Sequence, residues 1–218
     1  KWKPSVKITA TAEFRNRLFW GEEVKLIPDF AKELRNDNEK VNLQKAWIKK
    51  PALVVHTNTE RLYFEYREDY MNLRVGRQRI NWGLTTTWNP NDIFNTYNFL
   101  DFDYEERPGV DGGKLQYNFN NSFNTEVAYA HTGRKDGDVA ALKYNLNKWG
   151  YDMQLITGWY NDHMTLGAGW AGSIKDAGFK GEAQYFFRDK DSTDHFNMSL
   201  EGEPVRRSAA APAEVPCC

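Results

Sequence analysis

Cysteine is almost absent from this chain of 218 residues, because its two cysteines are Cys217 and Cys218 at the very end. Neighbouring cysteines in one tail cannot link distant segments, which excludes a disulfide framework or a cysteine-ligated metal site elsewhere in the chain. No stretch approaches the roughly 18 apolar residues of a membrane-spanning helix. The 29 lysines and arginines are balanced by 30 acidic residues, so there is no basic excess to indicate nucleic-acid binding.

Residue patterns that indicate catalysis are also missing. The four histidines, His56, His131, His163 and His195, are scattered, and no two stand at metal-ligand spacing. The chain has no Gly-x-Ser-x-Gly motif, so a serine nucleophile would need partners from distant strands. We therefore expect no enzymatic activity and no cofactor.

Regular alternation of apolar and polar residues is the strongest pattern that the chain does contain. Between Trp149 and Trp159 the odd-numbered positions are nearly all apolar, whereas the even-numbered positions are mostly polar or glycine. The same pattern recurs in residues 123–129 and 179–187. A period of two predicts strands whose two faces have different surroundings.

Two kinds of β protein could produce this alternation, and the placement of aromatic residues favours one of them. Tyr151 and Trp159 are eight residues apart, which is about 26 Å of strand, or about 20 Å of height after tilting, close to the apolar band of an outer-membrane barrel. A soluble sandwich would place its largest side chains in the middle of the strand. We therefore predict an all-β, antiparallel transmembrane β-barrel. The alternative is a soluble or surface β domain that binds glycans through exposed tryptophans.

About ten strands are expected, and they lie at residues 6–20, 52–67, 71–83, 110–119, 122–131, 139–146, 149–159, 164–173, 179–187 and 195–202. The connections after residue 109 mostly alternate between short turns and longer charged loops, as in outer-membrane barrels. The barrel domain is predicted to span residues 1–202, with long loops at 21–40, which has a weak helical pattern, and at 84–109. Residues 203–218 are expected to be disordered or foreign sequence. They lack a closing aromatic strand, so the chain is expected to form a barrel or only most of one.

The predicted strand at 71–83 contains a conflict between its apolar face and its arginines. If the parity of the strand continued, Arg77 and Arg79 would face lipid, where a charge at mid-membrane costs about 2–4 kcal/mol. A bulge at Gly76 would reverse the later parity and turn both arginines to the polar side. We therefore expect a break in strand pairing at or next to Gly76. The residues that would then face outward are Ile80 and Trp82.

Three motifs in this part of the chain carry a family resemblance. They are VGRQRINWG at 75–83, NPNDIFN at 89–95 and DFDYEERPG at 101–109. Together they resemble porin-like outer-membrane β-barrel proteins of Gram-negative bacteria, in which a GRQ strand leads into an NPxDxF loop. The resemblance is strongest over residues 59–119 and extends over 5–202.

This resemblance implies a location in the bacterial outer membrane, in contact with its lipid. It also implies a channel for passive passage or binding of small polar or charged solutes, without catalytic chemistry or nucleic acid as a partner. Neither the identity of the solute nor the oligomeric state follows from the motifs.

Charged residues suggest where such a channel would be narrowest. Acidic residues gather in the 84–109 loop, at Asp101, Asp103, Glu105 and Glu106. Basic residues on the predicted inner parity of neighbouring strands are Arg61, Arg67, Arg74, Arg77, Arg79 and Lys114. If the loop folds inward, acids would face a basic ladder across the opening and create a selective field. Two alternatives remain open: the charges form salt bridges or are solvated and only fix the loop, or the acids bind Ca²⁺.

Overall fold

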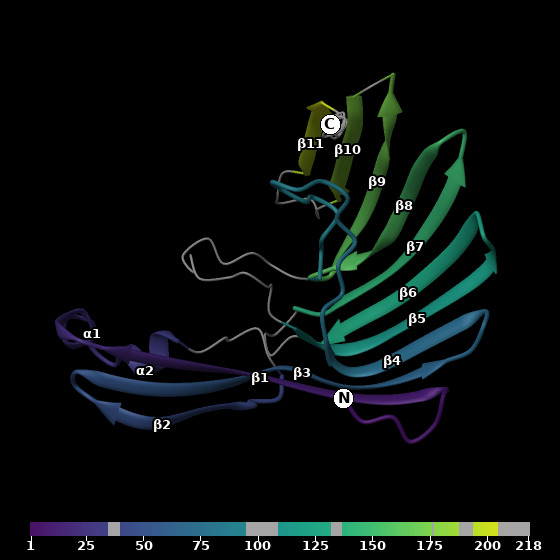
Figure 1. Ribbon diagram of the computed structural model, residues 1–218. Coiled ribbons are helices and arrows are strands. Elements are labelled where there is room, and N and C mark those ends of the chain that lie inside the picture. Colours follow the sequence, from purple (N-terminus) through teal and green to yellow (C-terminus); the bar gives the residue numbers. More distant parts are fainter. Residues whose placement is uncertain (35–39, 95–108, 132–136, 176, 188–193, 205–218) are drawn as a thin grey trace, which may run out of the picture.

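The computed structural model describes residues 1–34, 40–94, 109–131, 137–175, 177–187 and 194–204 (Figure 1). Within them, eleven strands form one antiparallel sheet. The strands are β1 (Ile8–Trp20), β2 (Gln44–Lys50), β3 (Leu53–Arg67), β4 (Met71–Gln78), β5 (Val110–Asn120), β6 (Phe123–His131), β7 (Val139–Lys148), β8 (Tyr151–Tyr160), β9 (His163–Ile174), β10 (Ala177–Phe186) and β11 (His195–Pro204). Two short helices, α1 (Glu22–Leu26) and α2 (Phe30–Glu33), follow β1. In the described part of the chain, no helix has the length and apolar content of a membrane span.

The strands are arranged as a meander. Their order in the sheet is β1, β3, β4 and then consecutively to β11, while β2 pairs with the first part of β3. This confirms the predicted all-β class with one antiparallel sheet of about ten strands. Over the described residues, however, β11 does not pair with β1 or β2, so the sheet is open, whereas the sequence predicts a transmembrane barrel or most of one.

Most element boundaries agree with the alternation in the sequence. Only β2 has no predicted counterpart among the described strands. The weak helical pattern within 21–40 corresponds to α1 and α2. β11 extends to Pro204, slightly past the predicted domain end at residue 202, and residues 205–218 lie outside the described part of the chain.

The sheet curves strongly, and we call its convex side the outer face and its concave side the inner face (Figure 1). Alternation sends large apolar side chains to the outer face, where Phe64 is 65% exposed, Trp159 61% and Leu155 50%. The inner face is polar and partly covered, since Glu65 is 9% exposed and Glu182 is fully buried. The sheet therefore exposes its apolar face and encloses its charged one.

The outer face carries a row of aromatic rings at the end with the short turns. Neighbouring centroids are 5.6 Å apart for Tyr70 and Tyr117, 4.8 Å for Tyr117 and Phe119, 4.9 Å for Phe119 and Phe123, and 6.4 Å for Phe123 and Tyr144. These residues come from β5, β6, β7 and the turn before β4. The row thus follows the rim across several strands rather than forming a local cluster.

The expected bulge at Gly76 is wrong. β4 pairs with β3 and β5 through Gly76 without a register shift. The glycine is required for a different reason, because its φ is +122° and an added Cβ would lie 2.4 Å from the Leu62 carbonyl oxygen. The strand also ends at Gln78 rather than at residue 83.

After β4 the chain leaves the sheet, and residues 79–94, which we call the strap, cross the inner face toward β10 and β11 (Figure 1). Ile80 and Trp82 are almost completely buried, so the expectation that they face outward is wrong. They form a core with Ile93, Phe94, Val110, Ala128, Ala130, Val139, Ala141 and Ile156. Apolar burial therefore draws the strap inward and ends β4 early.

Candidate functional site

The inner face under β1, β3 and β4 is built from ion pairs between neighbouring strands. Arg61 lies 3.2 Å from Glu13, which is directly opposite in the register of β1 and β3. Glu65 accepts from Arg67 and Arg74, each at 2.8 Å, and Arg74 is its register partner on β4. Three of the predicted basic residues, Arg61, Arg67 and Arg74, therefore face carboxylates of the same sheet.

Lys114 belongs to a second cluster, centred on the buried Glu126 of β6. Its Nζ lies 3.3 Å from Glu126 Oε2, and Lys143 Nζ lies 3.9 Å from Oε1. The indole N–H of Trp82 also donates to Glu126, and the Lys143 ammonium lies 5.2 Å from the centre of the Trp82 ring. Glu126 thus connects strands β5, β6 and β7 to the strap.

Arg77 occupies a different place from the other basic residues. Its guanidinium forms a two-pronged ion pair with Asp111, at 2.8 and 3.0 Å, and also donates to the carbonyl oxygens of Thr59 and Val41. Its register parity is that of Val75, on the outer face, yet only 2% of it is exposed. Arg77 therefore links β3, β5 and the segment before β2 at the point where β3 changes its partner from β2 to β4.

Arg79, the first residue of the strap, is half-buried. Its Nε is buried and has no hydrogen-bond partner among the described residues. The predicted acidic residues Asp101, Asp103, Glu105 and Glu106 lie outside the described residues. Their opposition to the basic ladder and the Ca²⁺ alternative both stay predictions.

The strap is held to β10 by one buried carboxylate. Glu182 accepts hydrogen bonds from the backbone N–H groups of Leu84, Thr85 and Asn91, with distances of 2.7 Å to Thr85 and 3.1 Å to Asn91. Backbone N–H groups that converge on a carboxylate satisfy a buried charge without a cation. Glu182 therefore fixes both ends of the turn between Leu84 and Asn91.

A second carboxylate holds the middle of this turn. Glu201 of β11 accepts from the backbone N–H of Thr86 at 2.8 Å and of Thr87 at 2.7 Å, and from the Thr86 hydroxyl at 2.7 Å. Gln154 of β8 adds a 2.8 Å bond to the Trp82 carbonyl oxygen. The strap is thus tied to β6, β8, β10 and β11, which brings together strands far apart in the sheet order.

Two glycines of β9 make room for the strap. Asn91 donates to the Ala168 carbonyl oxygen at 3.0 Å, between Gly167 and Gly169. An added Cβ would lie 2.8 Å from Asn91 Oδ1 at Gly167 and 3.1 Å from Asn91 Nδ2 at Gly169. Small residues at alternate inner positions are the signal in the sequence that could have revealed this close approach.

A cavity of about 330 Å³ opens on the inner face at the short-turn end of β6 to β8. Its polar lining includes Asn124, Asn145, Asp152 and Gln154. Asn145 donates to the Asn124 side-chain oxygen at 2.7 Å. This end of the inner face therefore offers mostly neutral amide groups, in contrast to the ion pairs under β1, β3 and β4.

Comparison of the chain with protein-family models, with curated proteins and with solved structures found no match. The resemblance of residues 75–109 to porin-like proteins therefore stays a prediction. The described residues thus form a sheet with an exposed apolar outer face and a charged inner face that the strap partly covers.

Proposed function

We propose that this chain forms part of the wall of an outer-membrane β-barrel, whose inner face lets small polar or charged solutes pass or bind. The observation that carries this proposal is the division of the sheet. Leu155 and Trp159 are half or more exposed on the outer face, whereas Glu126 and Glu182 are buried on the inner face. Exposure of such an apolar surface to water is unfavourable, whereas contact with the apolar tails of lipid is not.

Aromatic residues at both ends of the outer face support the same proposal. One row follows the short turns from Tyr70 to Tyr144. At the opposite end, Trp159 is 61% exposed, and Tyr185 and Phe187 are in edge contact at 4.7 Å. Amphipathic rings favour the interface between lipid and water, so two rows would mark the two surfaces of the membrane.

In this proposal the open edges of the sheet need partners. Unpaired backbone groups of an edge strand are costly in lipid, because no water is present to bind them. Further strands must therefore join β1 and β11 to close the wall. The strap would then narrow the enclosed channel, with Glu126 and Glu182 anchoring it from the wall.

The second candidate is a soluble or surface domain that binds glycans through exposed tryptophans. Trp20, Trp47 and Trp159 are 72%, 61% and 61% exposed, which such a domain would use as platforms. It would still have to cover the apolar residues between them. We favour the membrane because one environment accounts for the whole outer face.

Behaviour with and without detergent separates these candidates. The refolded chain should stay monodisperse only in detergent or lipid, and liposomes in which further strands pair its open edges should become permeable to small polar solutes. Leu155→Arg should impair membrane assembly, by about 2–4 kcal/mol for a mid-membrane position. Asn145→Arg is the matched control, since Asn145 lies half-buried on the inner face and follows Tyr144, the register partner of Leu155. A monodisperse protein in plain buffer, or equal damage from both substitutions, would contradict the proposal.

A further inference from the structure

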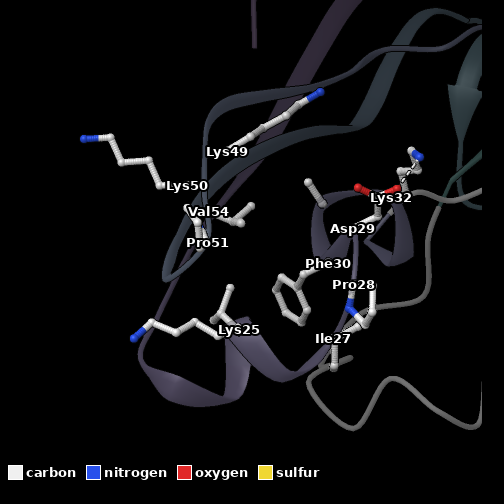
Figure 2. A pocket seen from close by; sticks show the side chains of 12 residues that line it. Lys25, Ile27, Pro28, Asp29, Phe30, Lys32, Lys49, Lys50, Pro51 and Val54 are labelled. Atoms are coloured by element: carbon white, nitrogen blue, oxygen red, sulfur yellow. Dashed lines mark hydrogen bonds and ion pairs between the residues drawn. The ribbon is translucent and has the colours of Figure 1, made fainter.

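The last residues of β1 and the first residues of β3, together with α1, α2 and β2, project beyond the rest of the sheet at its long-loop end (Figure 1). We call this projection the tip. The tip contains a cavity of about 400 Å³, which is within the usual range for small-molecule sites (Figure 2). Its walls include Val24, Phe30 and Val54, and its rim includes Lys32, Lys49 and Lys50.

One part of this cavity is apolar and well packed. Val54 of β3 and Val24 of α1 are only 3% and 7% exposed. Phe30 of α2 packs edge-on against Phe19 of β1, with ring centroids 5.1 Å apart. Helices and strands therefore fix these walls together, and a bound molecule would need an apolar portion to match them.

The rim of the cavity is cationic, with four lysines against one aspartate. Lys25 pairs with Glu22 at 2.5 Å, and Lys32 pairs with Asp29. The hydrogen bond from Lys32 holds the pKa of Asp29 below its usual range, so this aspartate stays charged and offsets Lys32 at neutral pH. These two lysines are therefore already balanced.

The other two lysines, Lys49 and Lys50, form no ion pair within 4 Å among the described residues, although the charge of Lys49 also helps to lower the pKa of Asp29. The register places Lys49 opposite Val54, on the side of β2 that borders the cavity. Lys45 of the same strand has the opposite parity, because its register partner is Thr57, and its ammonium lies 4.0 Å from the centre of the Trp47 ring. Strand β2 thus carries one lysine at the cavity and a comparable one directed away from it.

We propose that the tip cavity binds a small amphipathic anion, namely a carboxylate with an aromatic or aliphatic body. The body would lie against Phe30 and Val54, and the carboxylate would meet Lys49, with Lys50 adding to the field. This binding does not depend on the membrane placement of the sheet, so either proposal can fail without the other. A purely polar ion would leave the apolar wall unmatched, and a neutral ligand would leave Lys49 unused.

The test uses 2-naphthoate as the probe and 2-naphthalenemethanol as its uncharged counterpart. Binding is measured by calorimetry on the full chain held in amphipol, because free detergent could itself enter the cavity. We expect 2-naphthoate to bind more tightly than the alcohol and to weaken with added salt. Failure of 2-naphthoate to bind, or equal affinity for both compounds, would overturn the proposal.

Variants locate the binding. Lys49→Gln should weaken 2-naphthoate binding about three- to fivefold, as expected for a partly exposed ion pair, and leave the alcohol unaffected. Lys45→Gln, the matched control on the same strand, should change neither affinity. Phe30→Ala should weaken both compounds, with circular dichroism confirming that the sheet is intact. Equal losses from Lys49→Gln and Lys45→Gln would mean that the anion binds elsewhere.

Discussion

The two halves of the inner face are filled in different ways. Under β1, β3 and β4, long charged side chains meet across neighbouring strands, as Arg74 does with Glu65. Under β6 to β10, the wall carries small residues such as Ala128 and Gly167, and the strap lies on them. A concave polar face can therefore be packed either by its own paired side chains or by a separate segment of the chain.

This difference predicts unequal sensitivity to substitution. Where the strap lies on small residues, an added side chain has no space, and the whole segment must move to admit it. Where ion pairs fill the face, some members are partly exposed, such as Glu13, whose side chain is 43% exposed. Solvent screens such pairs, so a single loss there should cost less.

The largest effect is expected at Gly167, beneath the strap. Gly167→Val should lower the free energy of unfolding by about 2–3 kcal/mol, because the new side chain displaces Asn91 and Gln184. Gly113→Val is the control, since an added Cβ at Gly113 meets nothing closer than 3.8 Å. Urea unfolding in lipid vesicles measures both. Similar losses would indicate that the strap does not rest closely on β9.

A smaller and more local effect is expected at Glu182. Glu182→Gln keeps the shape of the side chain but weakens its hydrogen bonds to three backbone N–H groups, at a cost of about 1–2 kcal/mol. Hydrogen exchange should accelerate at Leu84, Thr85 and Asn91 and stay unchanged in β4.

Glu201→Gln provides the contrast for this experiment. It should accelerate exchange at Thr86 and Thr87, whose backbone N–H groups donate hydrogen bonds to Glu201. Exchange at the N–H groups that donate to Glu182 should stay unchanged. Unchanged protection throughout the strap in both variants would show that the carboxylates do not hold it in place.

The sheet was predictable from the sequence because most strands have one apolar and one polar face. β2 was missed because a register shift between Ala46 and Ile48 interrupts its alternation, and its sequence is rich in lysine. The end of β4 was missed for a different reason. Trp82 continues an apolar pattern, but tertiary packing buries it between the strap and the inner face instead of placing it on the outer face.

The candidate site was only partly predictable. The positions of Arg61, Arg74 and Lys114 on the inner face follow from parity, but their partners require the register between strands, which the sequence does not state. The strap anchors Glu182 and Glu201 are separated from it by about a hundred residues, as the contact of Thr85 with Glu182 illustrates. Such contacts arise only once the sheet has curved.

The smallest effect is expected at Arg61, on the ion-paired half of the inner face. Arg61→Gln removes the 3.2 Å pair with Glu13 and should lower the free energy of unfolding by at most about 1 kcal/mol, because that carboxylate is partly exposed. The loss should shrink further in 1 M salt, because the distance over which charges interact through solvent then falls to about 3 Å. Urea unfolding at low and high salt measures it beside Gly167→Val, whose steric cost should not depend on salt. A salt-independent loss at Arg61 as large as that at Gly167 would mean that the ion pairs are packed as tightly as the strap, and the contrast between the two halves would fail.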